Sequence, residues 1–361
     1  MPSFTVVVLL VAIVAPLLVS HFTGGWVAVY TSKGFTAEHI PRLDGQVAVV
    51  TGANTGIGKI TVRDLAQKGA RVVLTSRSVS KGNAARQEVC ELIGQQEDER
   101  CPVTVMALDL ASLESVLDFS SQLLDQFDRI DMLILNAGIM FGEYATTAEG
   151  FERQWGTNHL GHFFLVERLL PLLMTSRARV VSVSSSAHNM PYSHGIEFDQ
   201  LESDKNYNQF QAYGQSKLSN ILFARELSDR FSSSGLSSNS LHPGVIQTEL
   251  MRHANNDITS LLPTALADFV LYVENLSYNL LFMNPDQGAL TQLYVATSPD
   301  MAGVTGKFFK PVGMEVAPSA LGRDVSLQRR LWEVSARFTR RFLESKGLAR
   351  TELPASAGSW D

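Results

Sequence analysis

Tyr213 and Lys217 lie four residues apart in the stretch Ala-Tyr-Gly-Gln-Ser-Lys. On a helix this spacing places a phenol and an ammonium group on one face, and the apolar residues of 212–227 predict such a helix. A free tyrosine has a pKa of about 10, and a nearby cation favours the phenolate. We therefore expect Lys217 to bring the Tyr213 pKa toward neutrality, as a general acid or base requires. Chance also produces this spacing on ordinary helices, so its meaning depends on the rest of the chain.

A glycine-rich turn, Thr-Gly-Ala-Asn-Thr-Gly-Ile-Gly, occupies residues 51–58, after an apolar run at 46–50 and before a helical pattern at 59–68. Glycines let the backbone approach a pyrophosphate, and a helix N-terminus offers free N–H groups and the positive end of a dipole. In this strand–turn–helix context the turn predicts a dinucleotide site. Its spacing, Gly-x-x-x-Gly-x-Gly, departs from the common Gly-x-Gly-x-x-Gly form.

The end of the second predicted strand, Leu-Thr-Ser-Arg at 74–77, indicates which dinucleotide binds. NAD sites place a carboxylate there against the ribose 2′-hydroxyl. Here the strand end carries no acid, and Arg77 can pair with a 2′-phosphate, with Lys81 close by in sequence. The alternative is a solvated arginine in a loop. The pattern favours NADP(H).

Strand and helix patterns alternate along the chain, which is typical of a parallel α/β sheet. Strands are predicted at 46–50, 71–75, 103–108, 131–136, 179–184, 237–241 and 306–309, and helices at 59–68, 80–93, 113–127, 150–175 and 212–227. We expect one domain over residues 45–345, preceded by a linker at 33–44 and followed by a flexible tail at 346–361.

The first 32 residues contain no Asp, Glu, Lys or Arg, and 4–19 are almost wholly apolar. This stretch exceeds the about 20 residues that cross a bilayer, so we expect residues 1–32 to form a hydrophobic membrane anchor. The first charges, from Lys33 onward, predict by the positive-inside rule that the domain faces the cytosol, on the endoplasmic reticulum or another organelle. A cleaved signal peptide and a buried core helix are the alternatives.

Composition narrows the function classes. The net charge of −6 without a long basic run argues against nucleic-acid binding. The two cysteines, Cys90 and Cys101, fit a reducing, cytosol-facing environment better than a disulfide scaffold. No metal site is expected, because neither cysteine has a nearby histidine and the histidines are dispersed.

These motifs, with Asn136-Ala-Gly138, Ser185 and Pro243-Gly244, resemble the short-chain dehydrogenase/reductase superfamily in its chain order. Residues 184–188 (Ser-Ser-Ser-Ala-His) and the stretches at 212–217, 241–244 and 330–335 are similar to its retinol-dehydrogenase-like branch. The resemblance covers about residues 45–310. It implies a single doubly wound Rossmann domain with a parallel sheet of about seven strands.

The resemblance also implies site residues. Ser185 would hold the substrate oxygen, Tyr213 would exchange a proton with it, and Lys217 would bind the nicotinamide ribose and lower the Tyr213 pKa. Asn158 would orient a water that relays protons to Lys217. Ser184 and Ser186 flank Ser185, and the branch pattern selects Ser185. The implied cofactor residues are Gly52, Asn54, Thr55, Gly56, Ile57, Gly58, Arg77, Asp109, Leu110, Asn136, Ala137, Gly138, Tyr213, Lys217, Pro243, Gly244, Val245 and Thr248.

Two segments exceed a minimal domain of this kind. Residues 186–212 are expected to form a flap beside the site. The apolar region 248–287 suits a lid over a hydrophobic substrate, and equally a surface that rests on the membrane or on a partner subunit, including a homodimer. The expected function is NADP(H)-dependent hydride transfer to or from a retinoid-, steroid- or lipid-like carbonyl/alcohol pair. A non-catalytic NADP(H)-binding regulatory subunit and a broad xenobiotic carbonyl reductase are the alternatives.

Overall fold

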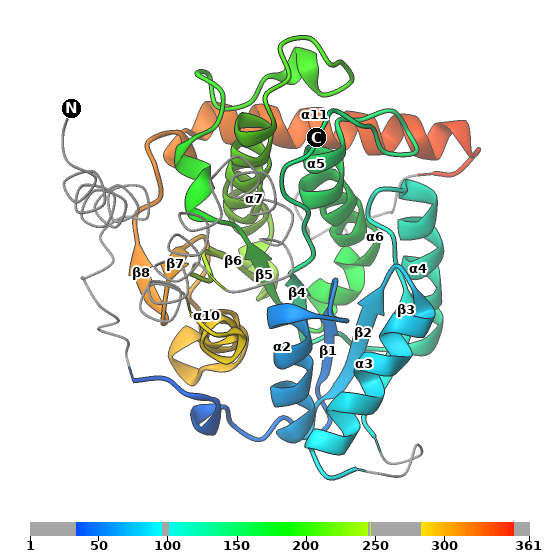
Figure 1. Cartoon of the computed structure of the whole chain (residues 1–361), viewed down its shortest axis with the longest axis vertical. Coiled ribbons are helices and arrows are strands. Elements are labelled where there is room, and N and C mark those ends of the chain that lie inside the picture. The colour runs from blue at the N-terminus through cyan, green and yellow to red at the C-terminus, as the bar shows by residue number, and fades with distance from the viewer. Residues whose placement is uncertain (1–33, 96–100, 245, 247–282, 350–361) are drawn as a thin grey trace, which may run out of the picture.

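The computed structural model describes residues 34–95, 101–244, 246 and 283–349. Its centre is one sheet of eight strands in the order β3-β2-β1-β4-β5-β6-β7-β8 (Figure 1). The strands are β1 (Val47–Val50), β2 (Arg71–Ser76), β3 (Val103–Ala107), β4 (Met132–Leu135), β5 (Arg179–Val183), β6 (Ser237–Leu241), β7 (Phe308–Lys310) and β8 (Met314–Val316). The seven predicted strands are present and parallel.

The prediction of about seven strands is wrong by one, because β8 pairs antiparallel with β7 at the edge of the sheet. Its three residues, Met-Glu-Val, are too short a run to show a strand period in the sequence. Elsewhere the parallel pairs give the doubly wound arrangement that the alternation of strands and helices predicts.

Strand order reverses between β1 and β4, which are direct neighbours although β2 and β3 intervene in sequence. The chain leaves these two strands toward opposite sides of the sheet, and ligands of open α/β sheets bind in the crevice that this opens at the strands' carboxyl ends. The glycine-rich turn follows β1, and Asn136 follows β4. Both therefore lie at this point.

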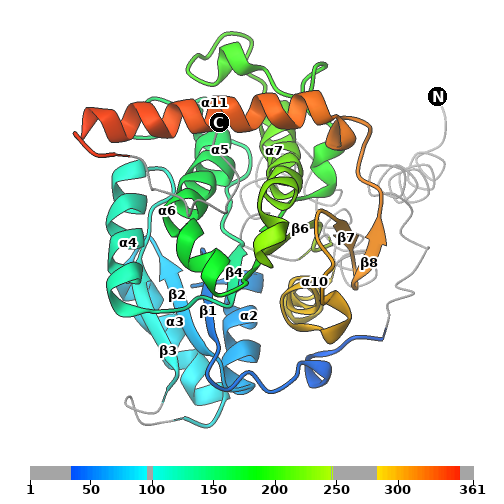
Figure 2. The same ribbon diagram turned by 180° about the vertical axis from the view of Figure 1, so that it is seen from behind.

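Two helical layers cover the sheet. The helices α2 (Gly56–Gln67), α3 (Val79–Leu92) and α10 (Pro285–Thr297) pack on one face, whose core includes Ala48 and Val50. The helices α4 (Leu113–Gln126), α6 (Gly161–Thr175), α7 (Gln209–Phe231) and α11 (Val325–Ser345) enclose the other core, which includes Val47 and Val49. In Figure 2 α4, α6 and α7 follow one another across the molecule. Successive side chains of β1 point to opposite faces of the sheet, so this one strand contributes apolar side chains to both cores.

Short helical turns connect these elements. The one-turn helix α5 (Arg153–Trp155) continues through the π-helical turn η2 (Gly156–Leu160) directly into α6. The other short turns are 3-10 helices, namely η1 (Ala37–His39), η3 (Ser186–Asn189), η4 (Phe198–Gln200), η5 (Ser232–Ser234), η6 (Pro299–Met301) and η7 (Leu321–Arg323). The predicted flap is thus described up to α7, with η3 and η4 inside it.

α11 lies across α7 and completes the second core (Figures 1 and 2). Trp332 at its centre is buried, stacking on Phe223 of α7 with centroids 6.0 Å apart and meeting Phe163 of α6 edge-on at 4.9 Å. Burying an indole of this size stabilises the domain by several kcal/mol, on the order of 3–5. The 330–335 stretch that resembles the retinol-dehydrogenase-like branch is therefore a packing element.

The described chain begins beside α10. Residues 33–44, expected to be a linker, include three buried side chains, Phe35, Ile40 and Leu43, and Phe35 meets Tyr294 edge-on at 5.3 Å. The predicted anchor at 1–32 lies outside the described residues, as do residues 350–361 of the predicted tail. Within the described ranges, no helix is both long and apolar enough to span a bilayer.

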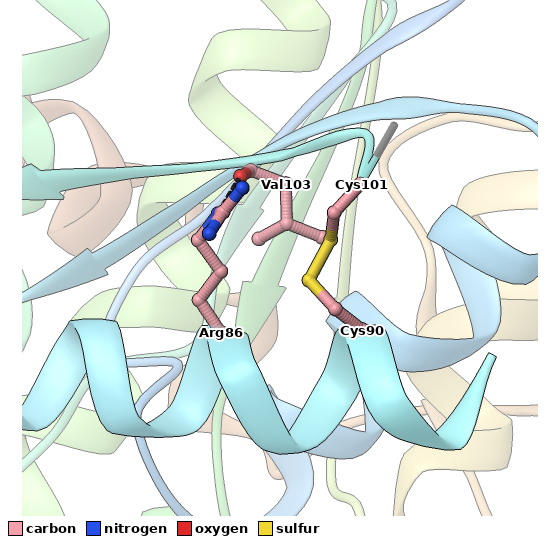
Figure 3. The surroundings of a disulfide bond; sticks show 4 residues. All are labelled: Arg86, Cys90, Cys101 and Val103. Atoms are coloured by element: carbon pink, nitrogen blue, oxygen red, sulfur yellow. Dashed lines mark hydrogen bonds between the residues drawn. A yellow bond between two sulfur atoms is a disulfide. The ribbon is translucent and has the colours of Figure 1, made fainter. Parts of the chain in front are cut away.

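The cysteine interpretation is wrong for this structure. Cys90, in the last turn of α3, forms a disulfide with Cys101, which precedes β3, and their Cα atoms are 5.6 Å apart (Figure 3). The side chain of Arg86 donates to the Val103 carbonyl oxygen at 2.7 Å, so a second contact joins the same two elements. The charged sequence between the two cysteines gives no indication that α3 and β3 lie side by side, so the disulfide was not predicted. Disulfides are typical of oxidising compartments, so the cysteines no longer support a reducing one.

Candidate active site

Tyr213 and Lys217 are brought together inside the molecule by α7. The helix is longer than predicted, because the Asn208 side chain caps it by accepting from two backbone N–H groups. Tyr213 is 7% exposed and Lys217 is 4% exposed. The Lys217 Nζ lies 5.7 Å from the centre of the Tyr213 ring and donates to the Val183 carbonyl oxygen at the end of β5 at 3.1 Å.

The pKa values of this pair differ from the sequence-based expectation. Burial raises the pKa of Tyr213 to about 12, while a hydrogen bond with Ser185 opposes that rise. Burial lowers the pKa of Lys217 to about 8. The expected lowering of the Tyr213 pKa is therefore wrong for this structure, since the Lys217 ammonium points to a backbone carbonyl and the desolvation of the phenol outweighs the effect of that charge. Tyr213 is consequently a neutral hydrogen-bond donor near pH 7.

Ser185 faces Tyr213 from the end of β5. Its side chain lowers the pKa of the Tyr213 phenol, and its hydroxyl accepts from the Ala187 backbone N–H at 3.2 Å. The preceding Ser184 instead donates its hydroxyl to the Lys217 carbonyl oxygen at 2.7 Å and is buried. Of these two adjacent serines, the one whose side chain lowers the Tyr213 pKa is Ser185, the residue that the branch pattern selects.

Asn158 lies in the π-helical turn η2 and is fully buried. Its side chain accepts from the Ile139 N–H at 2.8 Å, and its amide nitrogen donates to the Ile139 carbonyl oxygen and to the Ser216 hydroxyl, both at 2.9 Å. These bonds join the loop after β4 to α7. A Cβ at Gly138 would lie 3.1 Å from the Lys217 Nζ and 3.3 Å from the Asn158 Oδ1, so a glycine leaves room for both.

The glycine-rich turn is held by Asn136. Its amide nitrogen donates to the carbonyl oxygens of Thr51 and Gly52 at 2.8 and 3.2 Å. Gly52 has a positive φ of 62°, and a Cβ at Gly58 would meet the Gly52 carbonyl oxygen at 2.8 Å, so these glycines permit a tight turn under α2. Asn54, Thr55, Gly56 and Ile57 complete the turn and the first residues of α2.

Arg77 directly follows β2 on the same edge of the sheet. It is exposed, Lys81 one turn into α3 is also exposed, and neither side chain forms an ion pair in the part of the chain that the structure describes. Asp109 and Leu110 follow β3. The Asp109 carboxylate accepts from the Ala111 N–H at 3.0 Å, and Leu110 is buried.

Two further predicted residues, Pro243 and Gly244, follow β6, where Gly244 has a positive φ of 100°. Val245 and Thr248 lie outside the described residues, as does most of the predicted lid at 248–287. The last of its residues, from Pro285, form the first turn of α10. The structure thus places every described candidate residue at the carboxyl edge of the sheet or on the helices that border it.

A glutamine clamp beside Tyr213 was not predicted. Phe141 donates its N–H to the Gln154 side chain, and Gly142 donates its N–H to the Gln209 side chain, both at 2.8 Å. The Gln154 amide also donates to the Tyr207 hydroxyl at 2.9 Å and to the Gln209 carbonyl oxygen at 3.0 Å. Together these bonds fix the loop after β4 to the start of α7. No sequence signal marks two glutamines 55 residues apart as neighbours.

His162 is a second unpredicted contributor. Its Nε2 lies 2.9 Å from the Thr51 hydroxyl, which accepts from the Ala137 N–H at 2.9 Å. Its Nδ1 lies 3.0 Å from the Asn158 carbonyl oxygen. These bonds tie the glycine turn to the loop after β4 and to η2.

The chain is similar over most of its length to known proteins. A family model described as short chain dehydrogenase matches residues 46–198. Retinol dehydrogenase 14 of Mus musculus is 40% identical over 301 residues, which cover 81% of this chain and 85% of that protein. Retinol dehydrogenase 13 of Homo sapiens is 38% identical over 314 residues, covering 86% and 89%. The chain belongs to the short-chain dehydrogenase/reductase superfamily. Within it, the chain falls in the retinol-dehydrogenase-like branch, as its motifs predict.

Solved structures agree with this assignment. An uncharacterized protein from Mycobacterium Paratuberculosis superposes with a TM-score of 0.64 at 33% identity, covering 85% of this chain and 98% of the other. A protein described as a short chain dehydrogenase/reductase family protein superposes with a TM-score of 0.54 at 25% identity, covering 75% and 97%. The chain is accordingly an oxidoreductase of this superfamily, whose members bind a nicotinamide cofactor.

The residues at the β1–β4 crevice fit such a cofactor. Thr55 at the N-cap of α2 makes no side-chain capping bond, so the first-turn N–H groups remain available to a diphosphate. The Asn136 Oδ1 is buried, has no hydrogen-bond partner among the residues that the structure describes, and can accept from a ribose hydroxyl. The Lys217 ammonium has three N–H groups, of which one donates to the Val183 carbonyl oxygen, so the others can donate to a cofactor. Donors, acceptor and glycine turn thus match the parts of a dinucleotide.

Proposed function

We propose that this chain is an NADP(H)-dependent oxidoreductase that interconverts a hydrophobic carbonyl compound and its alcohol, with Tyr213 as the general acid/base. The observation that carries this proposal is the grouping of Ser185, whose side chain lowers the Tyr213 pKa, with the buried Tyr213 and Lys217 at the carboxyl edge of the sheet. Two hydroxyl donors that converge on one point can hold a carbonyl oxygen and stabilise the negative charge that develops on it.

A nicotinamide cofactor held by the glycine-rich turn, Asn136 and Lys217 would supply the hydride that the carbonyl carbon receives in the direction of reduction. Ser185 and Tyr213 hold the carbonyl oxygen through their hydroxyl groups. As the C=O π bond breaks, the phenol O–H of Tyr213 gives its proton to the oxygen, which becomes the alcohol hydroxyl. The ammonium of Lys217 stabilises the phenolate left on Tyr213 until a solvent proton returns to it. Oxidation follows the same steps in reverse.

Support for NADP(H) comes from charge at the end of β2. Arg77 and Lys81 supply two exposed cations, and the strand end carries no carboxylate that would repel a 2′-phosphate. A guanidinium can bind a phosphate with two parallel hydrogen bonds. Replacing Arg77 by Asp should therefore weaken NADPH binding about a hundredfold while leaving NADH binding nearly unchanged. Titration of each cofactor by fluorescence tests this, and an unchanged NADPH dissociation constant rejects the NADP(H) assignment.

Support for a hydrophobic substrate comes from aromatic side chains around Tyr213. The Phe141 ring meets the Tyr213 ring edge-on at 5.5 Å and the exposed Phe210 ring at 4.8 Å. Apolar walls with a few converging polar groups are typical of sites for apolar ligands. The names of the relatives, retinol dehydrogenases, indicate a retinoid-like substrate for those proteins, and we include retinoid, steroid and lipid aldehydes in the proposed class.

The decisive experiment compares wild-type protein with Tyr213→Phe. Full-length protein is mixed with NADPH and a panel of apolar aldehydes, and NADPH consumption is followed. The wild type should turn over at least one aldehyde, and the variant should lose at least about a hundredfold in kcat with little change in NADPH affinity. Equal NADPH consumption by the two proteins would sink the enzymatic proposal and favour the NADP(H)-binding regulatory subunit.

We also propose that residues 1–32 anchor the protein in an organelle membrane such as the endoplasmic reticulum. The uncharged apolar sequence supports the anchor. The charges that follow it predict a cytosolic domain, whereas a disulfide is typical of the opposite, oxidising side. Protease treatment of intact and of permeabilised microsomes decides between the two orientations.

A further inference from the structure

His188 links the loop that carries Ser185 to a distant part of the chain. It lies in η3, three residues after Ser185, and is only 2% exposed. Its Nδ1 lies 2.6 Å from the Ser185 carbonyl oxygen, and its Nε2 lies 3.3 Å from the Ser319 backbone nitrogen. The edge of the Phe308 ring packs on the imidazole at 5.1 Å between centroids.

These partners determine the tautomer of His188. A carbonyl oxygen only accepts and a backbone N–H only donates, so Nδ1 carries the proton and Nε2 is the acceptor. Burial lowers the pKa of His188, which keeps the ring in this neutral form near pH 7. Both ring nitrogens are therefore committed to backbone partners, one in η3 and one in the segment between β8 and η7.

The same turn touches α7 on another side. A Cβ at Gly214 would lie 2.3 Å from the Met190 carbonyl oxygen and 2.9 Å from the Ala187 carbonyl oxygen. Gly214 directly follows Tyr213, so the absence of a side chain lets the turn approach the helix next to the phenol. η3 is thus held between α7 and Ser319, and this sets how closely Ser185 approaches Tyr213.

We propose that His188 is a positioning residue that fixes the place of Ser185 beside α7 and Tyr213 by joining the Ser185 carbonyl group to the Ser319 backbone. The inference rests on the proposed function, because it assigns His188 a role in proton transfer through Ser185. The bond to the Ser185 carbonyl oxygen is the functional one, and the bond to Ser319 anchors the ring.

Two conservative variants separate these bonds. An asparagine amide nitrogen reaches the position of Nδ1, so His188→Asn retains the donor to Ser185 and loses the contact with Ser319. A glutamine side chain reaches the position of Nε2, so His188→Gln retains a contact with Ser319 and loses the donor to Ser185. If the role of His188 were purely structural, the variant with the lower melting temperature would lose more kcat, whether or not it keeps the bond to Ser185.

The test measures kcat and KM for an apolar aldehyde with full-length protein, together with NADPH affinity and Tm. His188→Asn should keep kcat within about threefold of wild type, and His188→Gln should lose about ten- to a hundredfold in kcat, with KM and NADPH affinity nearly unchanged. A larger kcat loss in His188→Asn than in His188→Gln overturns the inference. If His188→Gln does not fold, His188→Asn decides alone, and a loss beyond tenfold in that variant overturns it.

A second arm repeats His188→Gln in a Ser185→Ala background. A residue that acts through Ser185 should add less than about twofold to the loss that Ser185→Ala causes by itself, because the group it positions is gone. An equal loss in both backgrounds overturns the inference. If the wild-type protein has no activity, both the proposed function and this inference are overturned. If the wild type is active and the His188 variants have the same kcat as the wild type, only this inference is overturned.

Discussion

Phe141 shows how a single residue is prepared for contact with a substrate. Its backbone lies in the left-handed region at φ 61°, which costs a bulky residue on the order of 1–3 kcal/mol. The bond from its own N–H to Gln154 and the bond from the Gly142 N–H to Gln209 offset this cost. The result is an aromatic ring held edge-on against Tyr213, with ring centroids 5.5 Å apart.

Replacing Phe141 by alanine should therefore change substrate preference more than stability. We expect KM for a bulky apolar aldehyde to rise about tenfold, because about 1.4 kcal/mol of apolar contact is lost, while kinetics with a short aldehyde such as propanal change little. Steady-state kinetics with both aldehydes check this. Tyr144→Ala serves as the matched control on the same loop, since Tyr144 packs on Tyr207 instead. Equal changes for both aldehydes would refute the prediction.

For the individual site residues, the sequence was enough to predict their types and their order along the chain. The surroundings of each side chain in the folded protein could not be predicted from it. The sequence predicts Ser185, Tyr213, Lys217 and Asn158 as a set, and the structure brings them to one place. It does not predict that burial raises the Tyr213 pKa, because desolvation depends on what α6, α7 and η3 place around the ring. Nor does it predict the clamp by Gln154, whose partners come from two other segments, the loop after β4 and residues 207–209.

Among the elements, strands and glycine turns were the most predictable. Buried β-branched strands such as β1 and β2 are short apolar runs between turn residues, and all seven predicted strands occur. α10 and α11 were not predicted as helices. α10 follows the long apolar region and is almost wholly buried, so it lacks a polar face. α11 is amphipathic, yet its Trp332 stretch was noted only as a family resemblance.

The disulfide between α3 and β3 gives a prediction at this scale. It closes a loop with a sequence separation of 11 residues, so reducing it should lower the free energy of unfolding by about 3 kcal/mol. Denaturant unfolding with and without dithiothreitol measures the difference. The double variant Cys90→Ser/Cys101→Ser is the control, and its free energy of unfolding should be the same with and without dithiothreitol. A thiol titration that finds two free cysteines in the native protein would contradict the prediction.

For the whole molecule, buried neutral histidines make stability depend on acidity. Burial lowers the pKa of His159 to about 3, of His162 to about 4 and of His242 to about 3. Below the unfolded value of 6.5 the unfolded chain binds protons at these sites and the folded chain does not. Stability is therefore present above pH 6.5 and falls as the pH drops toward 4.

The expected slope is about 1.4 kcal/mol per pH unit for each group, or about 4 kcal/mol per pH unit for the three together. Urea unfolding between pH 6.5 and 4 measures it. His159→Gln retains a group that can meet the Ser335 hydroxyl, which lies 2.8 Å from Nε2 in the wild type, and removes the titration. The slope of that variant should be about 1.4 kcal/mol per pH unit smaller than the slope of the wild type. An unchanged slope would exclude His159 as a contributor.

The antiparallel strand β8 has a consequence for how copies of this protein meet. A long, unpaired strand at a sheet edge offers a template on which another chain can add a strand. Here the sheet ends in only three residues, and Glu315 at their centre pairs with Lys307 at 3.2 Å, with both side chains about half exposed. Desolvating this ion pair opposes strand addition. At this edge of the sheet, β8 therefore opposes aggregation through β-pairing.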